Sequence, residues 1–285
     1  MIAISRCAAS ISAPRWLRDV TPRATLRATP RALAKPAASA YLLLMSETLT
    51  LALVLIPALV FAIVFHEVAH GYAAKLLGDP TASERGRLTL NPFAHVDPVG
   101  TLLVPGGLAL LGAPVFGWAK PVPVNKWRLD NPRFGMMAVA AAGPGSNFVL
   151  ATIGALVLGL TMPAGLAFGD GMGVGASFLV DGSGEVAWLA TGLFYFLLVN
   201  IFLGLFNLLP IPPFDGSHIV GGLLPDSLRA GWERLQGIGM VLLLVLIASS
   251  WVFGTSWLSA ILGPPVEFAM QFFLGLADAV RALIA

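Results

Sequence analysis

The 285-residue sequence has few charged residues, a single cysteine and only four histidines. Charged residues make up 11% of the chain and hydrophobic residues 57%, whereas a typical soluble domain is about 25% charged. These values exclude water as the main solvent of the fold. Because Cys7 is the only cysteine, neither an intramolecular disulfide nor a cysteine-based zinc site can form.

Long apolar stretches are what the sequence has in place of charge. The clearest cover residues 48–74, 135–162 and 186–209, with a fourth at 236–254 and a last one at 257–284 whose placement the sequence leaves open. Such stretches reach the length of about 20 residues that crosses a bilayer core. They predict an all-α polytopic membrane protein with about four to five transmembrane helices, embedded in a lipid bilayer.

A basic leader precedes these stretches. Residues 1–44 contain seven basic residues and one acid, Asp19, so the leader carries +6 and leaves −4 for the rest of a chain whose net charge is +2. This composition is typical of a transit peptide or a disordered basic arm, and Met45 offers a later start. We predict three parts: a disordered leader or over-extended start (1–44), a membrane core (45–256) and a C-terminal apolar helix (257–285).

The distribution of positive charge predicts the orientation of the spans. Basic residues cluster at 75–87, 120–133 and 229–234, whereas the acidic loop 163–185 has none. Cytoplasmic loops carry the excess of Lys and Arg, so we expect the three basic clusters on the cytoplasmic side and the acidic loop outside. The first two clusters can share a side only if residues 99–118 do not cross. Glycines and prolines interrupt this segment, and we expect a short membrane-embedded strand or hairpin there.

The motif His66-Glu67-Val68-Ala69-His70 lies at the end of the first long apolar stretch. Histidines four residues apart lie on one face of a helix and can bind one Zn²⁺, with the intervening Glu67 as general base. A chance match is the competing interpretation. Two of the four histidines fall in this pattern, however, and ionisable groups in an apolar segment are costly without a ligand or partner. The motif predicts a zinc hydrolase.

A catalytic zinc site usually has a third protein ligand and one open position. The candidates in this sequence are His95, Asp97, His218 and the carboxylates associated with the membrane, among which Asp215 stands out. Asp215 ends a proline-broken segment directly after the third span, although Pro and Asp-Gly are also common in ordinary turns.

The predicted topology bears on this choice. If residues 99–118 do not cross the membrane, Asp215 reaches the same end of the protein as His66 and His70. If they do cross, Asp215 lies on the opposite face and cannot bind the same metal. Charge distribution and metal chemistry therefore agree on Asp215.

These motifs resemble those of the site-2 protease family of intramembrane metalloproteases (peptidase family M50), in its compact bacterial branch without a PDZ or CBS domain. The resemblance covers about residues 46–255. It rests on the His66–His70 motif, Ala142–Asn147 and Asn207–Gly216, and also on Gly86–Gly100 and Gly117–Asn125.

The resemblance implies that His66, His70 and Asp215 bind one Zn²⁺ per chain and that Glu67 is the catalytic acid/base. It also implies that Asn207, eight residues before Asp215, holds the scissile carbonyl or its oxyanion. Phe214 departs from the Leu that usually precedes Asp-Gly in the family.

Four other polar residues have simpler interpretations. Asn147 either lines the active-site groove or belongs to a Gly-Pro-Gly packing region, and the sequence leaves both open. His95 and Asp97 are expected to be structural, and His218 to form a local hydrogen bond.

The predicted function is hydrolysis of a peptide bond within or near a transmembrane segment of a membrane-protein substrate, which must unwind locally to expose its carbonyls. We expect the bacterial cell (inner) membrane as the location, with the active site near the cytoplasmic side. No nucleic-acid partner is expected, and the substrate and the oligomeric state stay unknown. The alternatives are a metal transporter, which should carry metal-binding residues on several spans, and a catalytically silent membrane scaffold.

Overall fold

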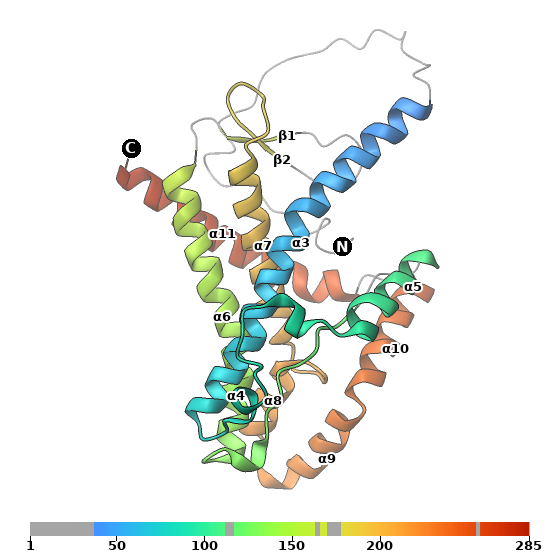
Figure 1. Cartoon of the computed structure of the whole chain (residues 1–285), viewed down its shortest axis with the longest axis vertical. Helices are drawn as coiled ribbons and strands as arrows, with labels where there is room; N and C mark the ends of the chain where they lie inside the picture. Colours follow the sequence, from blue (N-terminus) through green and yellow to red (C-terminus); the bar gives the residue numbers. More distant parts are fainter. Residues whose placement is uncertain (1–36, 112–116, 163–165, 170–177, 255–256, 285) are drawn as a thin grey trace.

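A computed structural model describes residues 37–111, 117–162, 166–169, 178–254 and 257–284 (Figure 1). Most of the predicted leader lies outside this part of the chain, and residues 37–44 belong to the first described helix. In chain order the elements are α3 (Ala37–Leu76), α4 (Thr81–Glu84), η1 (Pro92–His95), η2 (Pro98–Leu103), α5 (Val104–Leu110), η3 (Lys126–Arg128), α6 (Pro132–Thr161), β1 (Ala167–Gly169), β2 (Phe178–Val180), α7 (Trp188–Asn207), α8 (Asp215–Leu223), α9 (Asp226–Gly237), α10 (Gly239–Val252) and α11 (Trp257–Ile284).

Four helices in the described part of the chain are long and apolar enough to cross a membrane. They are α6, α7, α11 and the Leu51–Leu76 part of α3. Helices α9 and α10 are bent by 61° at their junction and make a fifth span only if they are taken together. The predicted all-α fold with four to five transmembrane helices is therefore confirmed, and the protein is an integral membrane protein.

Helix α6 lies at the centre of the packed helices and contacts α3, α7 and α11. The last of these contacts settles the placement of residues 257–284, which the sequence left open. Val266, Met270 and Ala277 of α11 are fully buried. A Cβ at Gly159 of α6 would overlap the backbone oxygen of Ala277, so the missing side chain lets the two backbones approach closely. Helix α11 is thus part of the core.

The described parts of the three basic clusters gather at one end of the molecule, around α4, α8 and α9 (Figure 1). Arg133, at the start of α6, donates to the carbonyls of Gly222 (2.8 Å) and Leu224 (2.6 Å) at the end of α8. The antiparallel hairpin β1–β2, within the predicted acidic loop, lies at the opposite end. The described parts of the basic clusters and of the acidic loop therefore lie at opposite ends of the molecule, as the charge pattern predicted.

The described residues at the two ends of the 98–118 segment lie side by side. The amide of Trp118 donates to the carbonyl of Gly100 (3.0 Å), and the amide of Lys120 donates to that of His95 (2.9 Å). The apolar helical stretch Pro98–Leu110 is too short to span a bilayer, which takes about 20 residues. Residues 98–110 of the predicted strand or hairpin are therefore helical, and its described residues contain no strand.

Candidate metal centre

Helix α3 presents His66, Glu67 and His70 at the depth where α6 crosses it. The apolar sequence from Leu51 onward keeps the helix in the packed core, and the four-residue spacing places both imidazoles on one face. The Nδ1 atom of His70 lies 2.7 Å from the carbonyl oxygen of Val139 on α6. A carbonyl only accepts, so this nitrogen carries the proton and Nε2 is left as a lone pair in the neutral ring.

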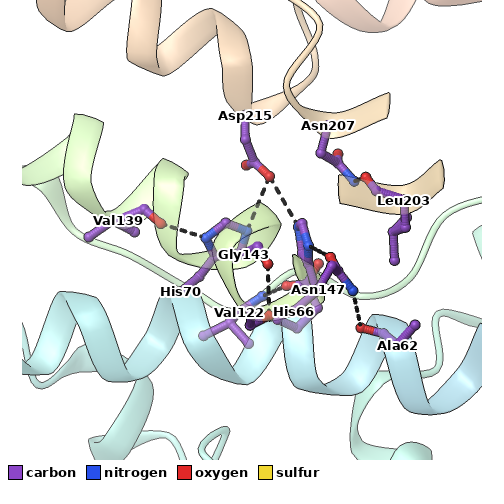
Figure 2. A network of polar contacts seen from close by, with 12 residues as sticks. Ala62, His66, His70, Val122, Val139, Gly143, Asn147, Leu203, Asn207 and Asp215 are labelled. Carbon is purple, nitrogen blue, oxygen red and sulfur yellow. Dashed lines mark hydrogen bonds and ion pairs between the residues drawn. The ribbon is translucent and has the colours of Figure 1, made fainter. Parts of the chain in front are cut away.

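Asp215 arrives from the other side, at the start of α8 (Figure 2). The proline-rich segment after α7 cannot continue as a helix, and the chain folds back so tightly that a Cβ at Gly216 would overlap the carbonyl oxygens of Leu208 and Leu209. The ring of Phe214 is buried against Phe206, with ring centroids 4.3 Å apart. The predicted turn residues thus aim the carboxylate at α3.

The structure brings the three predicted metal ligands together. Asp215 Oδ2 lies 3.0 Å from His66 Nε2 and 3.4 Å from His70 Nε2, and the candidate ligand atoms of the three residues all lie within 4.8 Å of one another. In the described chain this is the one such group of His, Cys, Asp and Glu side chains.

The chemistry of this group fits a metal ion. A neutral imidazole with its proton on Nδ1, as argued for His70, offers only a lone pair at Nε2, and a carboxylate is also an acceptor. Acceptors facing one another in a mostly buried site need a cation between them. Space for it exists because residue 143 is glycine: a Cβ there would lie 2.6 Å from His66 Nε2 and closer still to His70 Nε2. Two imidazoles and one carboxylate form a common ligand set for catalytic zinc.

Glu67 is held by a backbone amide rather than by another side chain. Its Oε2 accepts a hydrogen bond of 2.8 Å from the N–H of Val122. Prolines flank Val122 on both sides, so this is the one N–H in the triplet. Val122 belongs to the segment 120–125. Arg87 fixes the start of this segment by donating to the carbonyl of Lys120 (2.8 Å).

Asp79 fixes the other end of the same segment. Its side chain is fully buried and accepts from the amide of Asn125 (2.6 Å), the amide of Thr81 (3.0 Å) and the Thr81 hydroxyl. Burial alone would raise the pKa of Asp79, but these hydrogen bonds and the nearby Arg128 guanidinium outweigh it, so the pKa is held below its ordinary value. An ionised Asp79 therefore ties the segment to the end of α3.

The remaining predicted residues lie outside the three-ligand group. Asn207 donates from its side chain to the carbonyl of Leu203 (3.0 Å), one turn back in α7, and its substrate contact stays a prediction. His95 bonds the Thr89 carbonyl through Nε2 (2.9 Å), and Asp97 caps η2 through its side chain. His218 contacts Gln236. For His95, Asp97 and His218 the structural interpretations agree with these contacts.

Asn147 has a contact that the sequence left open. Its Oδ1 lies 2.7 Å from Nδ1 of His66, and its side chain is fully buried. Asn200, which no sequence motif singled out, accepts a hydrogen bond of 3.0 Å from Asn147 Nδ2. Two asparagines in strongly apolar spans were the available signal, because a buried amide needs partners.

Comparisons with known proteins agree with this site. Residues 54–249 match peptidase family M50. Three relatives carry the name "Putative zinc metalloprotease": YwhC of Bacillus subtilis (38% identical, over 68% of this chain and 80% of YwhC), Rip2 of Mycolicibacterium smegmatis (31%, 66% and 65%) and Rip3 of Mycobacterium tuberculosis (35%, 66% and 40%). The chain thus spans under two thirds of Rip2 and less than half of Rip3. No solved structure matches the chain.

Proposed function

Because the chain belongs to peptidase family M50, we propose that it is an intramembrane zinc metalloprotease. Its reaction is hydrolysis of a peptide bond within or near a transmembrane segment of a membrane-protein substrate. The observation that carries the proposal is the convergence of His66, His70 and Asp215 on one point beside Glu67, inside a bundle of apolar helices.

His66, His70 and Asp215 would hold one Zn²⁺ per chain. Zinc in such a site lowers the pKa of bound water to about 7 and polarises a carbonyl. The donor set supports this assignment, as do the relatives named as zinc metalloproteases.

Glu67 acts as general base and then as general acid. Its carboxylate takes a proton from the attacking water and passes it to the leaving amine. The hydrogen bond from Val122 to Oε2 holds one carboxylate oxygen in place, which leaves Oε1 for the proton. Because Val122 is tied through its segment to Arg87 and Asp79, the base keeps its orientation.

Asn207 contributes at the substrate carbonyl. A carboxamide has two N–H groups, one of which donates to Leu203. The other donates to the scissile carbonyl and, more strongly, to the oxyanion that develops from it.

The substrate is a protein whose transmembrane helix unwinds at the cleavage point, since helical carbonyls are already hydrogen-bonded. By the positive-inside rule the site lies near the cytoplasmic side, and the membrane is the bacterial cell membrane. The end of the molecule that carries α4, α8 and α9 faces the cytoplasm in this arrangement.

The test is cleavage by the purified chain of a peptide containing one transmembrane segment, with the cut mapped by mass spectrometry. We expect a cut within or next to the apolar segment, loss of activity with a zinc chelator, and recovery on adding zinc. Unchanged cleavage in preparations of both Glu67→Gln and Asp215→Ala would identify a contaminating protease. If cleavage is absent and zinc enters proteoliposomes, the protein is a transporter; if zinc is bound but neither occurs, it is a silent scaffold.

A further inference from the structure

Two asparagines are fully buried where three transmembrane helices meet. Asn147 lies on α6 and Asn200 on α7, and both face α3 or each other rather than lipid or water. A buried amide costs free energy unless it is hydrogen-bonded. Neither side chain takes part in the proposed reaction.

The partners of Asn147 determine which way its amide points. The Nδ2 atom lies 3.3 Å from the backbone carbonyl of Ala62 and 3.0 Å from Oδ1 of Asn200. A carbonyl only accepts hydrogen bonds, so the nitrogen of Asn147 must be on that side. Its oxygen then faces Nδ1 of His66, 2.7 Å away.

Asn200 is oriented by the same logic. Its Nδ2 donates to the carbonyl of Phe196 (2.9 Å), one turn earlier in α7. Its Oδ1 is therefore turned toward Asn147. The chain of contacts runs from the α7 backbone through Asn200 and Asn147 to His66, and every step has a single direction.

The orientation of the Asn147 amide determines the tautomer of His66. Because Asn147 presents an oxygen, Nδ1 of His66 must carry the proton, and Nε2 is a lone pair aimed at the point it shares with Asp215. His70 receives the same constraint from the backbone carbonyl of Val139, which no side-chain substitution removes directly. Of the two histidines, only His66 is therefore oriented by a side chain that can be substituted.

We propose that Asn147 and Asn200 are positioning residues that fix the tautomer and ring orientation of His66 and thereby set the affinity for Zn²⁺. The proposal rests on the zinc site of the proposed function. Hydrogen bonds to the second nitrogen of a metal-binding histidine fix its tautomer and raise its basicity, and their loss costs about 10- to 100-fold in metal affinity. Asn200 acts only through Asn147.

The experiment measures the zinc dissociation constant of the full purified chain by competition with a chromophoric chelator. The variants are Asn147→Ala, Asn200→Ala and the double variant, with Thr191→Val as matched control. Thr191 is also buried and hydrogen-bonded on α7, but its contact is with Leu179 in strand β2 of the hairpin. Thermal unfolding of the metal-free proteins reports the packing cost separately.

We expect Asn147→Ala to weaken zinc binding about 10- to 100-fold and Asn200→Ala to weaken it less. The double variant should bind zinc no more weakly than Asn147→Ala. The effects of two residues in one chain of hydrogen bonds do not add, because Asn200 reaches His66 only through Asn147. Thr191→Val should lower the unfolding temperature and leave the zinc affinity unchanged.

The outcomes separate this inference from the proposed function. Failure of the wild-type chain to bind zinc overturns both. Wild-type binding with unchanged affinity in Asn147→Ala overturns the positioning role alone, and a double variant equal to the product of the single effects overturns the route through Asn147. If Asn147→Ala does not fold, Asn200→Ala leaves the His66 contact in place, and unchanged zinc affinity in that variant overturns the proposal.

Discussion

Asp79 and Asp215 are both carboxylates withdrawn from water, yet their surroundings are opposite. Asp79 is met by donors: two backbone amides, the Thr81 hydroxyl and the Arg128 guanidinium at 4.0 Å. Asp215 is met by two imidazole nitrogens whose protons are committed elsewhere. The first carboxylate is satisfied by the protein alone, whereas the second has neighbours that could hold a metal ion with it. Burial therefore does not identify a metal ligand, whereas the kind of neighbour does.

Glu67 is a third carboxylate, intermediate between Asp79 and Asp215: one of its oxygens accepts a hydrogen bond from a backbone N–H. Its substitution should have the largest effect on the cleavage rate. Glu67→Gln should lower the cleavage rate by about 10²- to 10⁴-fold, because an amide cannot accept and return the proton. The zinc content should stay that of the wild type, since Gln keeps the volume and the contact with Val122 is not a metal contact. The measurement is the rate of peptide cleavage beside metal analysis of the same sample. A rate equal to the wild type would remove Glu67 from the mechanism.

Gly143→Ala tests whether zinc binds beside the two imidazoles. The added Cβ would lie within 2.6 Å of Nε2 of both His66 and His70. Overpacking costs about 1–3 kcal/mol, which corresponds to a zinc affinity weaker by about 5- to 150-fold if the cost falls on the bound state. Gly145→Ala is the matched control, because a Cβ there meets nothing within 4 Å. Equal zinc dissociation constants for the two variants would show that the metal lies elsewhere.

Asp79→Ala should lower the stability of the fold without changing zinc binding. The amides of Thr81 and Asn125 lose their acceptor, at about 1–3 kcal/mol for each group left unpaired. We expect a lower free energy of unfolding in detergent and an unchanged zinc affinity. Loss of zinc with unchanged stability would reverse the roles assigned to the two carboxylates.

The stabilising contribution of ionised Asp79 should also appear in the pH dependence of stability. The pKa of Asp79 is lowered by folding, so its contribution is fully present above the unfolded value of about 3.9 and is lost as the pH falls through the lower folded value. The difference in unfolding temperature between wild type and Asp79→Asn should therefore be constant near neutral pH and shrink below about pH 4. A difference that grows on acidification would contradict this sign.

The smallest effect is expected at the exposed ion pair near Asp79. Arg128 donates to Glu84 through two nitrogens, at 2.6 Å and 2.8 Å, but an exposed ion pair contributes little because solvent screens it. Glu84→Gln should leave the free energy of unfolding close to that of the wild type. A larger loss would mean that Glu84 helps to hold Arg128 against Asp79.

Much of the metal site was predictable because it rests on local rules. The spacing of His66 and His70 fixes their common face in any helix, and the charge pattern placed Asp215 at the same end. The spans Leu51–Leu76, α6 and α7 were predicted within a few residues, since hydropathy reports directly on a lipid environment, but the extension of α3 back to Ala37 was not predicted.

Other features depend on packing between distant segments. Hydropathy could not show that α11 is in the core while α10 joins α9 in a bent pair, because both sequences are apolar. Nor could it assign Asn147, whose partners lie 53, 81 and 85 residues away along the chain. The Val122 amide has no side-chain signature at all.

The most direct test is the zinc content of the purified full-length chain, measured for wild type, Asp215→Ala and Asp79→Ala in parallel. We predict one zinc ion per chain in the wild type and in Asp79→Ala, and none retained by Asp215→Ala after dialysis. Full zinc occupancy in Asp215→Ala would contradict the three-ligand site.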